Sequence, residues 1–470
     1  MKEKCFSKKK IQFRIGILAV LVLLFTGNIH ALAEGDFSVE DSITEFKQKT
    51  KCESASVVVC QDEDIAYYGD ADPAKLYQIG SMTKAFTGLA VMKLIEEGRI
   101  LPSGRVSDYI SGFSVYYENK EVDITINDLL CHTSGFTNSE KDYPSADENM
   151  TLTDWVQCIN GKALTYAPGA QYSYSNVNYN LLGALIEKVT GKSYREYMEQ
   201  EILQPLGLGN TYVGTPPDAD RIISGSRLGY RRTYAFSQPV KEGAIPAGYF
   251  YSTIEDMGRW LQIWLGSADI PATYKAVIEK TKELLARNTD CYAGWETCGN
   301  GAIGHSGGTA GYSSRIVYSL ASPVGVCVLT NLNVAASTDR LCNDIYAAMT
   351  ETVPNGYVQD VWTIFDLIFT AITICGLLVI CLSIYGRRHT RALLCFDVTE
   401  AILLVCILVI IPLIFQASWQ DILFIWAPWS MLGGILVLGM DVITLTIMIG
   451  IGKYANHNKK SRESTADHHC

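Results

Sequence analysis

The hydrophobic pattern changes along the chain, from short periodic segments in the first three quarters to long apolar runs near the C-terminus. Segments 54–60 and 65–68 are rich in β-branched and aromatic residues and flank the polar run 61–64, which predicts a β-hairpin. Residues 84–97 and 179–190 carry apolar side chains at helical spacing. Because each of these two segments is followed by a glycine, we predict two helices.

Further strands and a helix are predicted before the apolar runs begin. Segments 302–305, 312–319 and 324–329 have strand character, and 340–350 has the spacing of a helix. The region from about residue 100 to 290 is rich in loops, with scattered helices. Strands at both ends with helices between them predict an α/β fold, a sheet-and-helix layer domain with an inserted, mainly helical lobe.

Three apolar runs follow, each nearly free of charge and long enough to cross a bilayer. They cover 361–385, 399–415 and part of 423–452, and the polar segment 352–356 is the clearest boundary before them. We therefore expect three parts: an extracytoplasmic domain over 34–357, three transmembrane helices over 358–452 and a basic cytoplasmic tail over 453–470.

The N-terminus has the features of a secretory signal peptide over residues 1–33. A basic stretch, 1–14, precedes the apolar run 15–25, and the small residues Ala31 and Ala33 offer a cleavage site. The apolar run is short for a spanning helix of about 20 residues. An uncleaved N-terminal anchor is the alternative.

Positive charge predicts the orientation of the three helices. The connection between the second and third has no lysine or arginine, whereas the first connection and the tail are basic, through Arg387, Arg388, His389, Arg391, Lys453, Lys459, Lys460 and Arg462. Since basic segments stay in the cytoplasm, residues 34–357 should lie outside. Trp419, Trp426 and Trp429 would form an aromatic belt at the outer interface. We expect a multi-pass protein of the cell membrane, in contact with membrane lipid.

Asp441 lies inside the third apolar run, where a carboxylate is costly. It could pair with a partner helix, and self-association through the helices is one form of such pairing. Alternatively, the span begins earlier and Asp441 sits near the cytoplasmic interface.

Composition narrows the function. The net charge of −10 gives no basic stripe for nucleic acid, and neither a CxxC pair nor a His/Cys cluster has zinc-like spacing, so we expect no metal and no cofactor. The terminal His468-His469-Cys470 is expected to be a solvated tail. Cys291 with Cys298, and Cys52 with Cys60, are candidate disulfides, and most other external cysteines are expected to be buried.

The central chemical motif is Ser81-Met82-Thr83-Lys84 at the start of a predicted helix. Side chains three residues apart lie on one helix face, so Lys84 can contact Ser81. A serine hydroxyl needs a base in contact to become a nucleophile, and a lysine serves when its pKa is depressed. Because S-x-x-K also occurs by chance, this motif alone is weak.

Two further motifs strengthen the interpretation of Ser81 as a nucleophile. Tyr174-Ser175-Asn176 supplies a phenol that can relay a proton and an amide that can orient a carbonyl, although such residues also occur in surface turns. His305-Ser306-Gly307-Gly308 ends a predicted strand, and we interpret it as an edge along which a peptide-like substrate can pair. One backbone N–H there, with that of Ser81, could form an oxyanion hole. The alternative is a glycine-rich hairpin with an incidental histidine.

Five motifs in order, spread over residues 40–350, resemble the class C β-lactamase-like family, which includes β-lactamases, D-alanyl-D-alanine carboxypeptidases, D-aminopeptidases and esterases. These motifs are Gln78–Lys84, Ile124–Gly135, Tyr174–Asn176, Pro246–Gly248 and His305–Thr309. The resemblance implies a β-lactamase/DD-peptidase-like fold. It also implies a Ser81 acyl-enzyme.

The resemblance assigns roles residue by residue. Lys84 and Tyr174 would share the roles of base and proton shuttle, without deciding which deprotonates Ser81. Asn176 would contact the substrate carbonyl, and Gly308 would donate the second oxyanion-hole N–H. The strand residues His305, Ser306 and Gly307 would contact substrate as well. The stretches around His132 and Pro246–Gly248 would be structural.

One departure from the family concerns substrate. His305-Ser306-Gly307 stands where class C β-lactamases carry Lys-Thr-Gly, so a fixed positive charge is replaced by an imidazole that is neutral at most working pH values. This pattern resembles the peptidase and esterase branches and favours an amide or ester over a β-lactam.

These observations predict a membrane-anchored serine hydrolase that acts on a D-amino-acid-containing peptide, amide or ester, or on a β-lactam. The architecture also resembles colibactin-type prodrug-activating peptidases, which remove an N-acyl-D-asparagine cap, and this is one alternative. A β-lactam receptor without turnover is another, although its cytoplasmic parts would be very short.

Overall fold

A computed structural model describes residues 37–70, 72–138, 149–287, 290–299, 301–319, 321–385 and 390–466. The chain divides into Met1–Ser38 and one compact unit, Val39–Cys470, which contains every element below. The signal peptide predicted over 1–33, the basic residues 387–389 and the terminal 468–470 lie outside the described residues, and the side chains of the basic tail are likewise not described.

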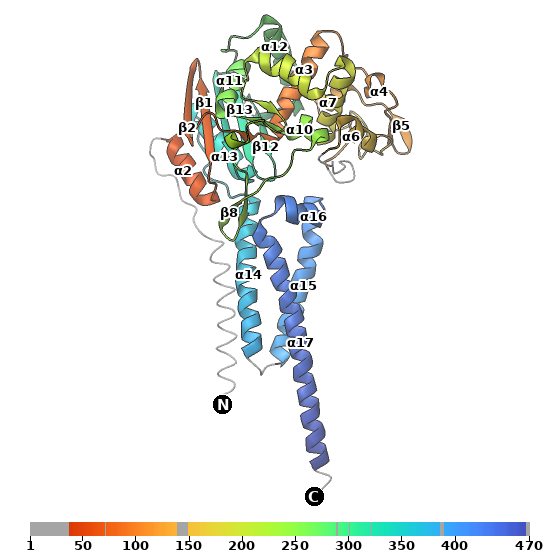
Figure 1. Cartoon of the computed structure of the whole chain (residues 1–470), viewed down its shortest axis with the longest axis vertical. Helices are drawn as coiled ribbons and strands as arrows, with labels where there is room; N and C mark the ends of the chain where they lie inside the picture. Colours follow the sequence, from red (N-terminus) through yellow and green to blue (C-terminus); the bar gives the residue numbers. More distant parts are fainter. Residues whose placement is uncertain are drawn as a thin grey trace. The chain divides into compact units, whose positions relative to one another are not determined.

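A seven-stranded antiparallel sheet forms the centre of the first part of the chain (Figure 1). Its spatial order joins the two ends of this part, because the N-terminal hairpin pairs with the last strand through β1 and β14. In order across the sheet the strands are β10 (Cys291–Tyr292), β11 (Trp295–Gly299), β12 (Ala302–Gly308), β13 (Ser313–Ser319), β14 (Val324–Thr330), β1 (Ala55–Gln61) and β2 (Asp64–Gly69).

Helices cover both faces of this sheet. One face packs against α2 (Val39–Thr50) and α13 (Ala335–Met349) in a smaller apolar core, and the other packs against α11 (Ile254–Leu265) in a larger core that continues into the helical lobe. Because both faces are covered, β1 and β14 consist almost wholly of buried residues and read as continuous apolar runs rather than alternating ones.

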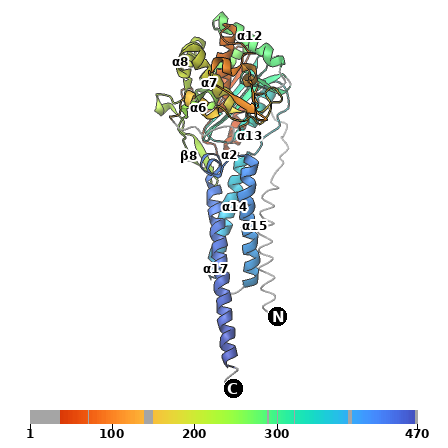
Figure 2. The ribbon, with the colours of Figure 1, turned by 90° about the vertical axis from the view of Figure 1, so that its right-hand side faces the viewer.

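The inserted lobe is mainly helical, as predicted, and carries several short strands (Figures 1 and 2). Its elements are β3 (Tyr77–Gln78), α3 (Thr83–Glu96), α4 (Val106–Tyr109), β4 (Val115–Tyr117), β5 (Lys120–Val122), α5 (Ile126–Leu130), α6 (Leu152–Ile159), α7 (Asn176–Thr190), α8 (Tyr194–Met198), α9 (Gln204–Leu206), β6 (Tyr212–Val213), β7 (Ser226–Gly229), β8 (Arg232–Ala235), α10 (Ile245–Gly248), β9 (Phe250–Ser252) and α12 (Ala272–Arg287).

Two sequence predictions need correction. β12 is not an edge strand, because β11 pairs with its first half; only the second half, from His305 to Gly308, lacks a β11 partner. The candidate disulfides are not formed. Cys52 and Cys60 belong to the cores on opposite sides of the sheet, and the thiols of Cys291 and Cys298 contact different neighbours, the Leu130 carbonyl and Arg315.

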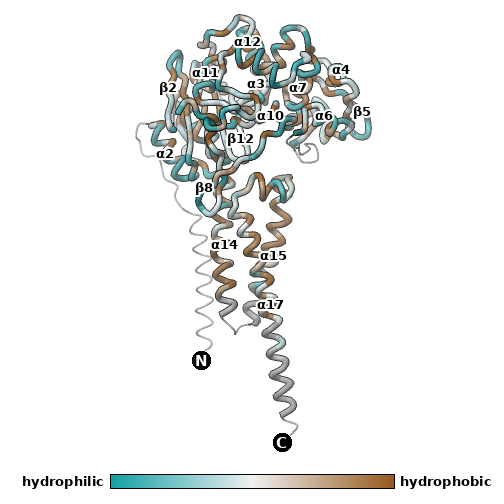
Figure 3. Tube along the Cα trace, viewed as in Figure 1, coloured by the Kyte–Doolittle hydropathy of each residue, from teal (hydrophilic) through white to brown (hydrophobic). Residues whose placement is uncertain are grey.

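Three long apolar helices follow the sheet domain, and each is long and apolar enough to cross a membrane (Figure 3). They are α14 (Val361–Tyr385), α15 (Thr390–Phe415) and α17 (Trp429–Ala466), and α17 contacts both others. A short helix, α16 (Trp419–Asp421), and a π-helical turn, η5 (Ile422–Trp426), connect α15 to α17. Asp441 is fully buried inside this bundle, against Gly376 of α14.

The helix bundle contacts the sheet domain through buried polar groups. Arg227 of β7 donates to the backbone carbonyls of Leu423 and Ala427, and its guanidinium stacks over the Trp429 ring at 4.0 Å. Nearby, the buried carboxylate of Asp366 accepts from the Arg231 amide at 2.9 Å and from the Ser430 hydroxyl at 2.7 Å. These contacts fix the α15–α17 connection beside the sheet domain.

Replacing Arg227 with methionine should destabilise this contact. The carbonyls of Leu423 and Ala427 would lose their donor, and each buried carbonyl left unpaired costs about 1–3 kcal/mol. Thermal unfolding of the full chain in detergent should show a midpoint at least about 2 °C lower. Arg232→Met on the neighbouring strand is the matched control, because Arg232 is exposed and should tolerate the change. Equal midpoints for the two variants would contradict this role of Arg227.

Candidate active site

Ser81 and Lys84 lie where a 3₁₀ turn, η1 (Gly80–Met82), runs into α3. The Lys84 amine is 3.0 Å from the Ser81 hydroxyl oxygen, as the i,i+3 spacing predicts. Lys84 is fully buried, and its amine also donates to the Asn176 side-chain oxygen and to the Ala247 carbonyl, both at 2.6 Å. The amine is therefore fixed by one serine and two neutral acceptors.

Burial lowers the pKa of Lys84 from 10.5 to about 7, and the negative charge of Glu296 opposes this shift. The protonated amine has three N–H donors, which match its three oxygen neighbours. The neutral amine has two donors, which Asn176 and Ala247 can take, and this leaves a lone pair directed at the Ser81 hydroxyl. The geometry therefore suits both protonation states.

Tyr174 and Asn176 approach the serine from the segment that opens α7. The Ser175 hydroxyl caps this helix by accepting a hydrogen bond from the Val177 amide. The residues on either side of the cap, Tyr174 and Asn176, face Ser81 and Lys84. The Tyr174 hydroxyl donates to the Ser81 oxygen at 2.8 Å. Because the Lys84 amine can only donate when charged, the Asn176 oxygen faces it, and the amide NH₂ is left for a substrate group.

The predicted structural role of His132 agrees with its position. It is buried, its Nδ1 accepts from the Ser175 amide at 3.1 Å, and its ring lies 4.7 Å from that of Tyr174. Burial, with the nearby charge of Lys84, holds the pKa of His132 well below its usual range. A neutral His132 therefore supports the segment that carries Tyr174.

The end of β12 is pressed against the serine turn because both backbones have glycines there. A Cβ on Gly80, where φ is +53°, would lie 2.6 Å from the Gly308 nitrogen, and a Cβ on Gly307 would lie 2.1 Å from the Ile79 carbonyl oxygen. Gly308 itself is open to solvent on its side-chain side. The backbone amides of Ser81 and Gly308 are thus brought to the same edge of a cleft, as an oxyanion hole requires.

Two of the predicted substrate-binding residues of β12, His305 and Ser306, lie away from the cleft surface. His305 is 3% exposed and packs near Tyr174, with 6.1 Å between ring centroids. Burial lowers the pKa of His305 to about 4, so the imidazole is neutral at pH 7. The Ser306 hydroxyl points to the other side of the strand, where it donates to Asp339 and accepts from Arg315, both at 2.8 Å.

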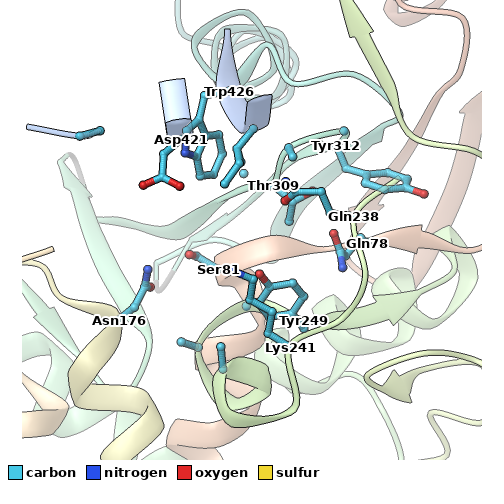
Figure 4. Close-up of a pocket in the computed structure, with 18 of the residues that line it drawn as sticks. Gln78, Ser81, Asn176, Gln238, Lys241, Tyr249, Thr309, Tyr312, Asp421 and Trp426 are labelled. Atoms are coloured by element: carbon cyan, nitrogen blue, oxygen red, sulfur yellow. The ribbon is translucent and has the colours of Figure 1, made fainter. Parts of the chain in front are cut away.

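Ser81, Asn176 and Gly308 line a cleft of about 710 Å³, a volume suited to a small ligand (Figure 4). Sequence reasoning missed much of its lining, including Gln78, Lys241, Tyr249 and Tyr312. It also assigned Pro246–Gly248 only a structural role, whereas the Ala247 carbonyl holds the Lys84 amine. Neither a backbone carbonyl nor a lone lysine in a loop carries a sequence signal for such a role.

Comparison with known proteins identifies the family of the chain. The family model described as beta-lactamase matches residues 39–349, which is more than half of the chain. The chain belongs to the β-lactamase family. Protein flp of Staphylococcus aureus strain MW2 is 30% identical to this β-lactamase-family chain over 380 residues, covering 76% of this chain and 74% of the relative. A β-lactamase of Escherichia coli strain K12 is 28% identical, covering 60% and 76% respectively.

Solved structures show the same fold. An octameric penicillin-binding protein homologue from Pyrococcus abyssi aligns with a TM-score of 0.58 at 24% identity, over 70% of this chain and 80% of that one. A class C β-lactamase aligns with a TM-score of 0.56 at 19% identity, over 70% of this chain and 100% of that one. These likenesses confirm the predicted β-lactamase/DD-peptidase-like fold. The family match ends at residue 349, before the three apolar helices.

Gly80→Ala tests the close approach of η1 and β12 in this β-lactamase-family chain. The added methyl group would displace the Gly308 amide, so labelling of Ser81 by a fluorophosphonate should slow by roughly 10²–10³-fold, the usual cost of losing one oxyanion-hole donor. Gly98→Ala is the matched control, because Gly98 also has positive φ, at +72°, but nothing within 4 Å of the added carbon. Similar labelling rates for the two variants would contradict a close contact between the Gly80 and Gly308 backbones.

The pKa of Lys84 predicts a pH dependence. If the neutral amine activates Ser81, the second-order labelling rate should rise as pH increases and level off above the pKa of about 7. Labelling time courses, quenched at intervals and run at pH values between 5 and 9, measure this profile. The pKa of His305 lies near 4, so His305→Gln should keep the inflection. A rate independent of pH, or an inflection lost in His305→Gln, would contradict the assignment to Lys84.

Proposed function

We propose that this chain is a membrane-anchored, extracytoplasmic serine hydrolase that acts through a Ser81 acyl-enzyme on a D-amino-acid-containing peptide, amide or ester. One observation carries the proposal. The Ser81 oxygen lies within hydrogen-bond distance of both a buried lysine amine, Lys84, and a phenol, Tyr174, at the edge of a cleft. A serine in a merely structural position has no need of two proton-transfer groups.

The proposed reaction has two halves. First, the Ser81 oxygen attacks the substrate carbonyl while its proton passes to the neutral Lys84 amine, and the backbone amides of Ser81 and Gly308 stabilise the oxyanion. The carbon–nitrogen or carbon–oxygen bond then breaks, and the leaving group takes the proton by way of Tyr174. Second, water attacks the acyl carbonyl and gives up a proton to the Lys84–Tyr174 pair. The ester bond to Ser81 then breaks, the pair returns the proton to the Ser81 oxygen, and the acid leaves.

Lys84 is the better candidate for the base of the first half. Its amine contacts the serine directly, and its lowered pKa of about 7 provides a neutral form at physiological pH. Tyr174 donates to the serine oxygen in the same geometry, which suits the later delivery of a proton.

The neutral imidazole of His305 on β12 favours an amide or ester substrate over a β-lactam. Buried His305 is neutral at pH 7 and does not line the cleft, so it supplies no positive charge for a substrate carboxylate. We propose that His305 positions Tyr174, and that Asn176 and Gly308 contact substrate.

The three apolar helices support placement in the membrane. Each is long and apolar enough to span, and the basic residues of the predicted cytoplasmic segments support an outside location for residues 34–357 by the positive-inside rule. We therefore propose a signal peptide over 1–33, a hydrolase domain over 34–357, membrane helices over 358–452 and a cytoplasmic tail over 453–470.

Ser81→Ala should abolish covalent labelling of the full-length protein by a serine-directed fluorophosphonate. The chemical reason is the loss of the attacking oxygen, and in-gel fluorescence measures the effect. Ser237→Ala is the matched control, because Ser237 lines the same cleft but is not the serine held by Lys84 and Tyr174. Equal labelling of the two variants would place the nucleophile elsewhere.

Turnover distinguishes the hydrolase from a receptor. The wild-type protein should release product from D-alanyl-D-alanine peptides, D-amino-acid amides, N-acyl-D-asparagine amides or short esters, with nitrocefin as the β-lactam comparison. A stable acyl-enzyme with no released product would favour a β-lactam receptor. The absence of both labelling and turnover would refute the serine-hydrolase proposal.

A further inference from the structure

The cleft beside Ser81 has walls from two distant parts of the chain. One wall belongs to the sheet and its inserted lobe and is mostly polar, with Gln78, Gln238 and Lys241 among its residues. The opposite wall comes from the ends of the apolar helices and the connection between α15 and α17, where apolar side chains lie beside polar ones, Gln416, Ser418, Gln420 and Asp421. We call the large apolar side chains of this second wall the apolar wall: Trp362, Phe415, Ile422, Ile425 and Trp426.

Specific contacts hold the apolar wall in place. Trp362 and Phe415 stack with 5.0 Å between ring centroids, which joins the start of α14 to the end of α15. Arg227 of the sheet domain donates to carbonyls at Leu423 and Ala427, on either side of Trp426. The Arg227 contacts hold the backbone on both sides of Trp426, whose ring lies across the cleft from Ser81 (Figure 4).

The position of the apolar wall relates the cleft to the predicted membrane surface. Trp362 begins α14, Phe415 ends α15, and Trp426 precedes α17, so these aromatic residues mark the same end of the three candidate spans. Large aromatic residues at the end of a span are typical of the membrane–water interface. A molecule anchored by an apolar chain in the membrane would meet this wall first and the serine beyond it.

We propose that the apolar wall is a subsite for an apolar chain, and that the substrate is an amphipathic molecule whose scissile carbonyl reaches Ser81 while its chain lies along Trp426 and Ile425, the residues of this wall that are least buried in η5. This inference rests on the proposed function and adds the substrate class. The polar wall contacts the headgroup, and the apolar wall contacts the chain. The helices therefore contribute to specificity in addition to anchoring the protein.

A pair of alkyl fluorophosphonates tests the subsite, one with a short chain of two carbons and one with a chain of ten. The full-length protein in lipid nanodiscs should react at least tenfold faster with the long-chain probe, because burial of each methylene can strengthen binding several-fold. The measurement is the ratio of the two second-order labelling rates, long over short.

Variants of the apolar wall separate the subsite from simple partition of the probe into lipid. Trp426→Ala should reduce the long-to-short ratio at least fivefold, and Ile425→Ala should reduce it in the same direction. Phe424→Ala is the matched control: Phe424 is the aromatic neighbour of Ile425, it is 53% exposed, and it does not line the cleft. Lipid partition is the same for all these proteins, so it cannot produce a difference between them.

The outcomes are distinct for the two proposals. No labelling of the wild type by either probe would overturn the proposed function, and this inference with it. Labelling of Ser81 with a long-to-short ratio near one, or with a ratio that Trp426→Ala and Phe424→Ala change equally, would overturn the apolar subsite and leave the hydrolase intact.

Discussion

The buried amine of Lys84 is the group around which the site is organised. Burial removes it from water, and since none of the described carboxylates lies within ion-pair distance, neutral oxygens must hold it. Those oxygens come from Asn176 on α7 and Ala247 on α10, while the amine itself belongs to α3. Three helices of the lobe must therefore pack correctly before the amine acquires its low pKa and its contact with Ser81.

The sheet contributes the other half of the site by a different means. The end of β12 approaches the serine turn only because Gly80 and Gly307 have no side chains to separate the two backbones. The first half of β12 is paired on both sides, which fixes the strand, and the second half is unpaired on the cleft side. The lobe thus holds Ser81 and the proposed proton-transfer groups, and the sheet holds the Gly308 amide.

Sequence reasoning predicted what is local and missed what is not. The hairpin at 54–68, the helix after Ser81 and the late strands were predicted within a few residues, because hydrophobic period and flanking glycines determine them. The start of α7 lies three residues before the predicted start at 179, where the Ser175 side chain caps the helix. The three apolar runs were predicted as helices from their length and their lack of charge. The Ala247 carbonyl, the separation of Cys52 from Cys60 and the apolar wall depend on tertiary contacts between distant segments, which no local pattern records.

The pairing of β1 with β14 has a consequence for the order of folding. Ala55 lies opposite Thr330, so the central sheet cannot close until nearly the whole domain has been synthesised. Contacts of such large sequence separation fold slowly, since loop closure precedes the gain from pairing. During synthesis, Ser81 leaves the ribosome long before Gly308, the residue whose backbone amide would complete the proposed oxyanion hole. If Ser81 acts as proposed, a nascent chain has no hydrolase activity until the C-terminal strands have been added.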